Sequence, residues 1–201
     1  MVVLITGAAH RIGREISLAL AKQGHSIALH FKHSKETAVQ LAEQINNMKT
    51  GKAYIYYADL SDSASVQNLI NDVTRCDTLD HIVNNASSFK HDTISSVTSD
   101  SFDEMMAVNL KAPLLLSKEF IAYRRSLFAL PLSQTSLPLP VYPSVINILD
   151  QKVASTNADN LSYTLAKHGL HSLTEMLAKE TAPMIRGMSG GKGEINIQSL
   201  I

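Results

Sequence analysis

The chain has 201 residues, 45% hydrophobic and 18% charged, so it can bury a core and is not a disordered polypeptide. Its 18 basic and 18 acidic residues balance and form no basic run, which argues against a nucleic-acid partner or an anionic membrane surface. A single cysteine and the absence of any apolar stretch of about 18 residues predict a soluble, cytoplasmic protein without a membrane span.

Short apolar runs alternate with longer helical patterns along the chain. The runs that predict buried strands lie at 2–6, 26–31, 53–58, 81–86 and 144–149. The patterns that predict helices lie at 12–23, 35–47, 63–74, about 99–126 and about 160–182. Together they predict an α/β fold, a doubly wound parallel sheet of the Rossmann-like kind, in one domain over residues 1–201. Ligands of such sheets bind at the carboxyl ends of the strands.

One segment interrupts this alternation. Residues 127–143 contain all but two of the six prolines, which argues against regular structure there. We expect a long surface loop before the fifth strand. The functional alternative is a flap over the site, because long loops carry function more often than short ones.

A glycine turn follows the first strand. Gly7 comes directly after the strand and Gly13 lies at the start of the next helix. Backbone N–H groups in such a turn can approach a pyrophosphate at the positive end of the helix. The spacing departs from G-x-G-x-x-G, and Arg11 stands where a middle glycine could be. Arg11 is either a surface residue or a fixed cation beside an anionic ligand.

The second strand is followed by Lys32, His33 and Ser34. A site for the 2′-hydroxyl of a dinucleotide usually has an acidic residue near this position, and none is present in this stretch. An ammonium, an imidazole and a hydroxyl suit a 2′-phosphate instead. We therefore predict NADPH rather than NADH as the cofactor, with an ordinary basic loop as the alternative interpretation.

A tyrosine and a lysine four residues apart begin the last long helix. Tyr163 and Lys167 share one helix face and can converge on a ligand. The ammonium is expected to lower the phenol pKa from about 10 towards neutrality, which makes the phenol a usable general acid. Asp150 stands at the end of the preceding strand, 13 positions before the tyrosine, where it could meet both groups.

These motifs together resemble the short-chain dehydrogenases/reductases, from residue 1 to about residue 183. The matching strings are TGAAHRIG (6–13), ADL (58–60), NNAS (84–87), VNL (108–110) and YTLAK (163–167). The resemblance implies an active site of Asn109, Tyr163 and Lys167. It also implies cofactor contacts from Ile12, Asp59, Asn85, Ala86 and Ser87. Asp59 would hydrogen-bond adenine, although capping its own turn is the alternative.

Asp150 stands where the family usually has a serine, and this departure resembles the pteridine reductase branch. Arg11 in the glycine turn, the string HFKHS (30–34) and NNASSF (84–89) resemble it as well. The branch implies that Phe89 stacks on a pterin ring, Ser87 hydrogen-bonds the ligand and Arg11 reaches both ligands. A flat, electron-poor heterocycle with N–H groups suits an aromatic face and a carboxylate acceptor.

We therefore expect an NADPH-dependent oxidoreductase that reduces a C=N bond of a pterin or dihydrofolate. Tyr163 would supply the proton, and Asp150 would position the tyrosine and the ring N–H groups. Lys167 would hold the nicotinamide ribose, and Asn109 would keep a water path to Lys167. The alternatives are a truncated, poorly active homologue that still binds cofactor and a reductase of another carbonyl substrate.

The end of the chain departs from the family pattern. Residues 194–201 could supply a sixth strand, but no seventh strand follows. The chain is thus either a complete, C-terminally shortened enzyme or a truncated product. The family forms oligomers through the long helices predicted at about 99–126 and 160–182, so a homo-oligomer is expected. His168 and His171 have metal-ligand spacing without a third ligand motif, so no metal site is expected.

Overall fold

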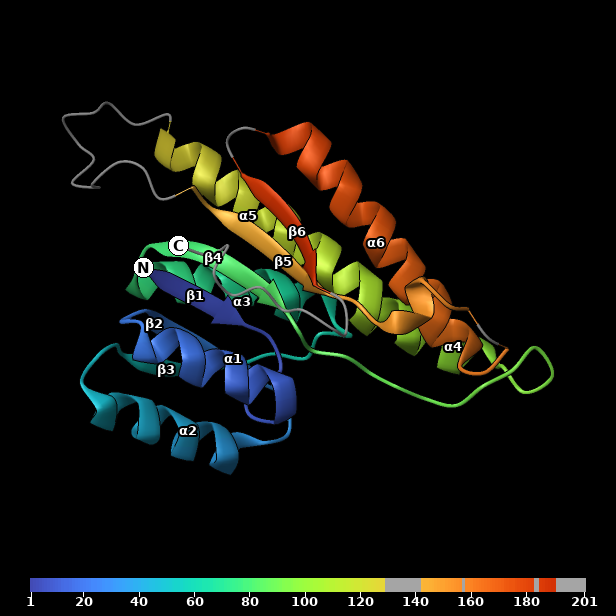
Figure 1. Cartoon of the computed structure of the whole chain (residues 1–201), viewed down its shortest axis with the longest axis horizontal. Coiled ribbons are helices and arrows are strands. Elements are labelled where there is room, and N and C mark those ends of the chain that lie inside the picture. The colour runs from blue at the N-terminus through green and yellow to red at the C-terminus, as the bar shows by residue number, and fades with distance from the viewer. Residues whose placement is uncertain (129–141, 157, 183–184, 191–201) are drawn as a thin grey trace.

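The computed structural model describes residues 1–128, 142–156, 158–182 and 185–190 (Figure 1). Six parallel strands form one sheet in the order β3-β2-β1-β4-β5-β6. The strands are β1 (Val2–Ile5), β2 (Ser26–Phe31), β3 (Ala53–Tyr57), β4 (Leu79–Asn84), β5 (Ser144–Ile148) and β6 (Arg186–Gly190). The chain runs outward from β1 to β3 and returns to β4 on the other side of β1. The sheet therefore has a topological switch point between β1 and β4.

Helices cover both faces of the sheet. They are α1 (Arg11–Lys22), α2 (Lys35–Met48), α3 (Ser63–Cys76), α4 (Ser99–Met106), α5 (Ala112–Phe128) and α6 (Leu161–Thr181). One apolar cluster packs α1 and α2 against the sheet through residues such as Ile16 and Leu41. A second cluster packs α3 and α5 against the opposite face, where Phe120 is fully buried and Leu177 of α6 joins the edge. The predicted doubly wound, Rossmann-like α/β fold is confirmed.

The first five predicted strands and the predicted helical ranges lie within two residues of the observed elements. The largest shift concerns β4, which begins at Leu79 because Leu79 pairs with Val2 of β1. It ends at Asn84 because the next residue turns away, and both the backbone N–H and the side chain of Asn85 bond to the first βα turn. That these elements make up one domain over residues 1–201 stays a prediction.

The long helical pattern at about 99–126 contains a break that its periodicity did not predict. A π-helix, η1 (Ala107–Lys111), joins α4 to α5. The π-helix packs against α6 at Gly169, where an added Cβ would come within 2.7 Å of Leu110 Cδ2. Such π-turns are rare and are frequently found at functional sites, and this one carries Asn109.

Two expectations about irregular segments need comment. The predicted proline-rich loop at 127–143 begins too early, because α5 continues to Phe128; most of it, 129–141, lies outside the described residues. The strand beside β5 is Arg186–Gly190, so the prediction that residues 194–201 supply the sixth strand is wrong for that position in the sheet. Residues 194–201 themselves lie outside the described part.

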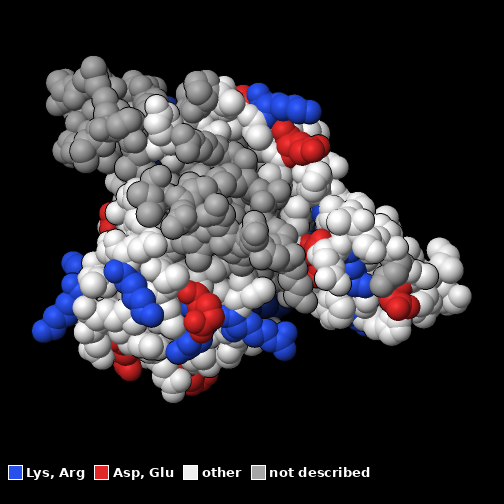
Figure 2. All heavy atoms as spheres, in the orientation of Figure 1, with Lys and Arg blue, Asp and Glu red and all other residues white. Residues whose placement is uncertain are grey.

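Charge and membrane features are described for the same residues. On the face shown in Figure 2, basic and acidic side chains of the described residues are interspersed. No helix in the described part of the chain is both long enough and apolar enough to cross a membrane. Among residues 1–128, 142–156, 158–182 and 185–190, no group of three His, Cys, Asp or Glu side chains is arranged to hold a metal ion.

Candidate active site

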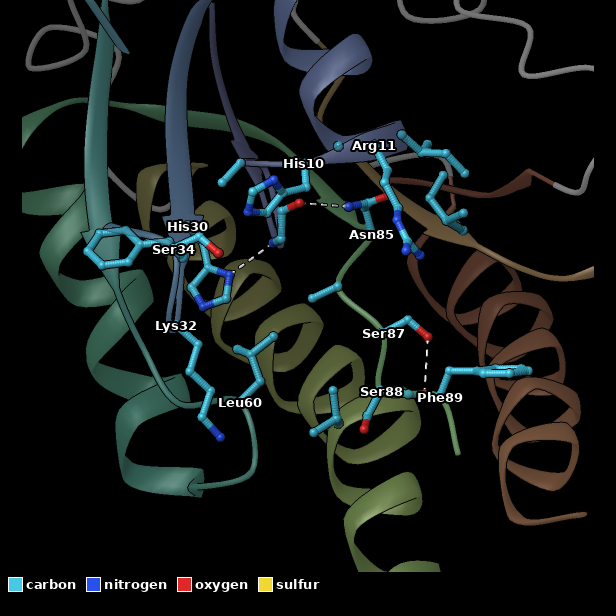
Figure 3. A pocket seen from close by; sticks show the side chains of 18 of the residues that line it. His10, Arg11, His30, Lys32, Ser34, Leu60, Asn85, Ser87, Ser88 and Phe89 are labelled. Atoms are coloured by element: carbon cyan, nitrogen blue, oxygen red, sulfur yellow. Dashed lines mark hydrogen bonds between the residues drawn. The ribbon is translucent and has the colours of Figure 1, made fainter. Parts of the chain in front are cut away.

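A cavity of about 690 Å³ opens at the carboxyl ends of the strands, beside the switch point between β1 and β4 (Figure 3). The glycine turn after β1, the ends of β2 and β3, the segment after β4 and the first turns of α6 form its walls. The predicted site residues that line it are Gly7, Arg11, Ile12, Gly13, Lys32, His33, Ser34, Asp59, Asn85, Ala86, Ser87, Phe89, Asp150, Tyr163 and Lys167. Only Asn109, of the residues predicted, does not line it.

The glycine turn is shaped by close backbone packing. Gly7 has a φ of +62°, in the left-handed region that favours glycine, and an added Cβ would lie 3.0 Å from Ala86 Cα. At Gly13 an added Cβ would lie 2.3 Å from the carbonyl oxygen of Gly7 and 2.6 Å from Asn85 Nδ2. Side chains at either position would fill the turn, so its shape fits the backbone-lined cradle expected for a dinucleotide.

His30 supports this turn and was missed in the sequence, where it was one of several scattered histidines. Its Nδ1 accepts a hydrogen bond from the Gly7 N–H at 3.0 Å, so the ring proton is on Nε2, which donates to the Ala58 carbonyl at 3.1 Å. Burial lowers the pKa of His30 to about 4, against smaller opposing effects of Ala58 and Asp59. The neutral imidazole thus links the ends of β1, β2 and β3 by hydrogen bonds.

Arg11 occupies the first position of α1 with a φ of +46°, an uncommon backbone conformation for a residue with a side chain. Its guanidinium extends towards the side of the cavity where Ser87 and Phe89 lie (Figure 3). A fixed cation is therefore available to an anionic ligand in the cavity. This placement favours the ligand-facing interpretation of Arg11 over a purely surface one.

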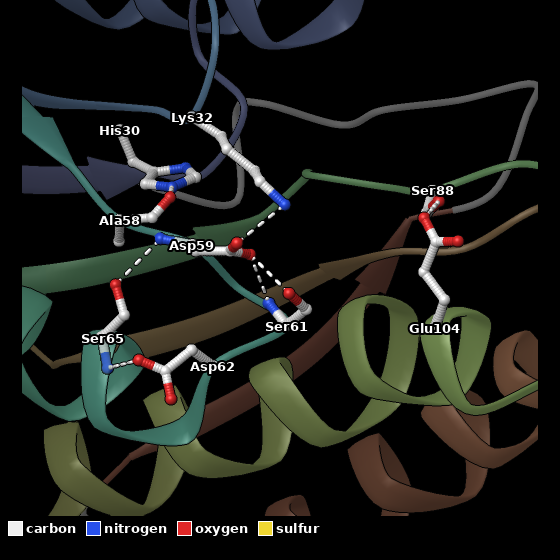
Figure 4. Close-up of polar contacts among 9 residues, drawn as sticks. All are labelled: His30, Lys32, Ala58, Asp59, Ser61, Asp62, Ser65, Ser88 and Glu104. Atoms are coloured by element: carbon white, nitrogen blue, oxygen red, sulfur yellow. Dashed lines mark hydrogen bonds and ion pairs between the residues drawn. The ribbon is translucent and has the colours of Figure 1, made fainter. Parts of the chain in front are cut away.

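Lys32 is already paired with a carboxylate (Figure 4). Its Nζ lies 2.9 Å from Asp59 Oδ2, and Asp59 Oδ1 accepts hydrogen bonds from the N–H and hydroxyl of Ser61 at 2.9 and 2.6 Å. The hydrogen bond from Lys32 is the main reason why the pKa of Asp59 falls to about 2. The sequence showed no acidic residue directly after the second strand. In space, however, Asp59, two residues after the end of β3, supplies one.

Asn109 lies behind the cavity wall, not in it. Its Oδ1 accepts from the Ser87 hydroxyl at 2.7 Å and the Ser88 N–H at 3.1 Å, and its Nδ2 donates to the carbonyls of Ser88 and Met105 at 2.9 and 3.0 Å. The amide therefore holds the segment after β4 in place. These contacts use both the oxygen and the nitrogen of the side chain. The expected water path from Asn109 to Lys167 stays a prediction.

The phenol, the carboxylate and the amine come together at the other end of the cavity. The Tyr163 hydroxyl donates to Asp150 Oδ2 at 3.0 Å, and the Tyr163 ring meets Phe89 edge to face, with centroids 4.8 Å apart. Lys167 Nζ donates to the Ile148 carbonyl at 2.7 Å and lies 5.7 Å from the centroid of the Tyr163 ring. Tyr163 and Lys167 are 5% and 3% exposed, so both ionisable groups are buried.

The expected lowering of the tyrosine pKa is wrong for this arrangement. Burial raises the pKa of Tyr163 far above 10, the charge of Asp150 and its hydrogen bond raise it further, and the Ser87 hydroxyl opposes them weakly. Burial also lowers the pKa of Lys167 to about 8, partly offset by Asp150. The carboxylate contacts the phenol directly, whereas the amine is turned to a backbone carbonyl. Desolvation and the carboxylate therefore outweigh the ammonium.

Other residues of the wall were given no site role in the sequence. Leu60 and Val108 belong to the matching strings ADL and VNL, and their adjacency to Asp59 and Asn109 is the signal that could have identified them. Glu104 lies one helical turn before Val108, and its carboxylate accepts from the Ser88 hydroxyl at 3.1 Å (Figure 4). No local pattern marks Glu104, because its place in the wall depends on how α4 meets the segment after β4.

Comparison with known proteins gives consistent matches. Residues 1–195 match the sequence model of the family described as short chain dehydrogenase. A short chain dehydrogenase/reductase, dpchG, of Colletotrichum higginsianum is 32% identical over 182 residues, covering 90% of this chain and 63% of that protein. The 3-oxoacyl-[acyl-carrier-protein] reductase FabG of Staphylococcus aureus is 28% identical over 180 residues, covering 89% of this chain and 68% of FabG.

Among solved structures, FolM alternative dihydrofolate reductase 1 from Brucella suis in complex with NADP is similar with a TM-score of 0.80 and 34% identity. The match covers 94% of this chain and 73% of that one. The Brucella canis protein complexed with NADP gives the same score and identity. The chain thus spans 63% to 73% of the length of these relatives, and less than two thirds of dpchG.

Proposed function

Because the chain belongs to the short chain dehydrogenase family, we propose that it is an NADPH-dependent reductase of a pterin or dihydrofolate C=N bond. The observation that carries the proposal is the hydrogen bond from Tyr163 to Asp150 beside the exposed ring of Phe89. This set offers a proton donor, a carboxylate acceptor and an aromatic face within one cavity. The two FolM structures with NADP belong to relatives that are named as dihydrofolate reductases, which agrees with the proposal.

NADPH would supply the hydride when bound. The turn from Gly7 to Gly13 would hold its pyrophosphate, because its backbone cradle has no room for side chains at either glycine. Lys32, His33 and Ser34 would hold the 2′-phosphate, since they line the cavity with an ammonium, an imidazole and a hydroxyl. Lys167 would hold the ribose of the nicotinamide, with protons left over from its bond to the Ile148 carbonyl.

The substrate end suits a heterocycle better than a simple ketone. Asp150 can accept hydrogen bonds from ring N–H groups, which a ketone lacks. Phe89 is 61% exposed and lines the cavity, so part of its face remains available to a flat ring. Ser87 and Arg11 add a hydroxyl and a cation on the same side. A ketone oxygen would instead meet the negative carboxylate at a position where the family usually has a serine donor.

Tyr163 would donate the proton that reduction of a C=N bond requires at nitrogen, since the phenol is protonated at neutral pH. Its raised pKa makes it a weaker acid than a free phenol, so the forming phenolate must be stabilised during the transfer. Asp150 accepts from the hydroxyl and so orients it before the substrate arrives. A buried amine with a pKa near 8 can carry a charge near the phenolate as it forms. Lys167 therefore acts on the developing charge and not on the resting phenol.

The test is NADPH oxidation with dihydrobiopterin, dihydrofolate and a 3-oxoacyl thioester, preceded by fluorescence titration of NADPH. We expect turnover with a pterin or dihydrofolate and little with the thioester. In Asp150→Ser, pterin turnover should fall by about 100-fold while NADPH affinity is kept, in line with the usual range for a group that assists proton transfer. Tight NADPH binding without any turnover would support the alternative of a cofactor-binding homologue. Turnover of the thioester alone would support a reductase of another carbonyl substrate.

Three further expectations, about assembly, location and partners, remain predictions. Assembly into a homo-oligomer would cover exposed apolar side chains such as Leu114 on α5 and Leu165 and Met176 on α6. Light scattering of the purified protein measures this directly, and a monomer at all concentrations would contradict it. The expected cytoplasmic location and the absence of a nucleic-acid partner also stay predictions.

A further inference from the structure

The segment between β4 and α4 is tied at its far end to the start of the helix that carries Tyr163. Asp92 is 3% exposed, and its Oδ1 accepts from the Ser162 N–H at 3.2 Å. Its Oδ2 accepts from the Ser162 hydroxyl, and its backbone carbonyl accepts from the Leu161 N–H at 3.2 Å. Because α6 begins at Leu161, these donors belong to the first turn, whose N–H groups have no partner within the helix.

The helix is not capped by the side chain of its own preceding residue. Asn160 makes no side-chain cap and has a φ of +58°, and its Nδ2 donates to the Lys90 carbonyl at 3.3 Å. The cap therefore comes from Asp92, 70 positions earlier in the chain. A carboxylate at the positive end of a helix is stabilised by both the hydrogen bonds and the helix dipole. The first turn of α6 is thus built onto the segment after β4.

That same segment forms the wall of the cavity opposite Tyr163. Ser87 and Ser88 are held by Asn109, and the Phe89 ring packs against Tyr163. Tyr163 directly follows Ser162, which is hydrogen-bonded to Asp92. The wall and the phenol are consequently fixed to each other by a contact that lies outside the cavity, since Asp92 does not line it.

We propose that Asp92 is a positioning residue that sets the place of the Tyr163 phenol relative to the substrate wall, an inference that rests on the proposed function. Proton transfer needs heavy atoms about 2.6–3.2 Å apart, and a misplacement of about 1 Å can lower a rate about 100-fold. Loss of the cap would let the first turn of α6 move relative to Phe89. The glycine turn and the end of β2, proposed to hold NADPH, make no contact with Asp92 in any hydrogen bond described.

The experiment compares Asp92→Ala, Asp92→Asn and Ser162→Ala with Asp62→Ala. Asp62 is the matched control, because its carboxylate caps α3 through the N–H groups of Ala64 and Ser65 at 3.2 and 3.0 Å, away from Tyr163. For Asp92→Ala we expect kcat to fall at least about 10-fold, NADPH affinity to change less than about twofold, and the primary isotope effect with C4-deuterated NADPH to rise. Asp92→Asn should recover part of kcat, since its amide oxygen can still accept from Ser162. Asp62→Ala should lose thermal stability and keep kcat.

Unchanged kcat in a folded Asp92→Ala protein overturns the proposal, as does an equal loss of kcat in Asp62→Ala. If Asp92→Ala does not fold, Ser162→Ala decides, because it removes only the hydroxyl bond. A fall of kcat of a few fold supports the proposal, and no fall overturns it. Hydrogen exchange of the amides at 161–164 gives a readout independent of substrate, and should be faster in Asp92→Ala but not in Asp62→Ala. If the wild-type protein reduces no pterin but exchange at 161–164 is still faster in Asp92→Ala, the proposed function fails while the capping role of Asp92 stands.

Discussion

The two ends of the cavity are built in opposite ways. At the end formed by β2 and β3, Lys32 and Asp59 are about one third exposed and form an ion pair. At the end formed by β5 and α6, Tyr163 and Lys167 are buried, and their pKa values are shifted by desolvation. The exposed end can therefore attract charge by simple pairing. The buried end controls protons, because small changes in contact alter ionisation strongly there.

The largest effect is expected at the buried end, from Tyr163→Phe. This change removes the proton donor and keeps the ring that packs on Phe89. Because general acid catalysis contributes about 100- to 10,000-fold, kcat should fall by that range with NADPH affinity nearly unchanged. Stopped-flow or steady-state NADPH oxidation measures the change. Tyr57→Phe, at a tyrosine that is 63% exposed, is the control and should keep kcat. A Tyr163→Phe protein within a few fold of wild type would remove the phenol from the mechanism.

The next largest effect is expected on stability, from His30, the neutral histidine that supports the glycine turn. The pKa of His30 is about 4 in the fold against 6.5 when unperturbed, so the unfolded chain binds more protons between these values. Its contribution is fully present above pH 6.5 and is lost as pH falls towards 4, by up to roughly 3 kcal/mol. Urea unfolding at several pH values measures the slope. His81, whose pKa burial also lowers to about 4, should supply a similar share.

His30→Asn tests that assignment, because an amide can accept from Gly7 without titrating in this range. The slope of unfolding free energy between pH 6.5 and 4 should become shallower than in wild type. His91→Asn, at an exposed histidine, should leave the slope unchanged. An unaltered slope in His30→Asn would show that the turn does not depend on the neutral imidazole.

Local pattern and long-range contact explain what the sequence could predict. The strands and helices follow from apolar periodicity, and the glycine turn is a continuous motif, so both are readable from neighbouring residues. The pairing of Lys32 with Asp59 joins the ends of two strands, and the grip of Asp92 on Ser162 spans 70 positions. No local pattern encodes such contacts. Asn109 lies in the π-helix, so the direction of its side chain depends on that irregular turn. The apolar periodicity of the sequence does not reveal the π-helix either.

The sign of the tyrosine pKa shift shows the same limit. Residue types near Tyr163 indicate an ammonium and a carboxylate, but not which of them touches the phenol. In the structure, Asp150 is the contact and Lys167 is turned towards Ile148. The residue types in a motif therefore do not determine whether the pKa of its tyrosine is raised or lowered, because that depends on which group contacts the hydroxyl.

The buried amine predicts a pH profile. With a pKa of about 8, Lys167 loses its proton above that pH, and kcat/KM for NADPH reports groups of the free enzyme. We expect kcat/KM to be level near neutrality and to fall about tenfold for each pH unit well above 8. The phenol should add no limb in this range, because its pKa is raised. Lys167→Arg, which stays charged, should remove the fall whatever its absolute rate. A level profile up to pH 9.5 in wild type would contradict the assignment.

The smallest effect is expected at the exposed end of the cavity. There a substitution can remove the ion pair between Lys32 and Asp59 while Lys32 remains available to the cofactor. A 2′-phosphate must share Lys32 with Asp59, so the carboxylate weakens what the ammonium can give to NADPH. In Asp59→Asn the amide oxygen can still accept from Ser61, while the negative charge is gone. Because partly exposed ion pairs contribute about 0.2–1 kcal/mol, NADPH affinity should rise up to about fivefold and NADH affinity should stay level.

Fluorescence titration of both nucleotides measures this change in preference. Asp72→Asn removes the same charge from an exposed pair with Arg75 outside the cavity, so it controls for net charge and should change neither affinity. A loss of affinity for both nucleotides in Asp59→Asn would mean that the carboxylate contacts the adenosine directly, as the resemblance to the family implies. A gain for NADPH alone would mean that Asp59 acts as a competitor for Lys32. In that case the exposed end of the cavity tunes its choice of nucleotide by sharing one cation, whereas the buried end works by excluding water.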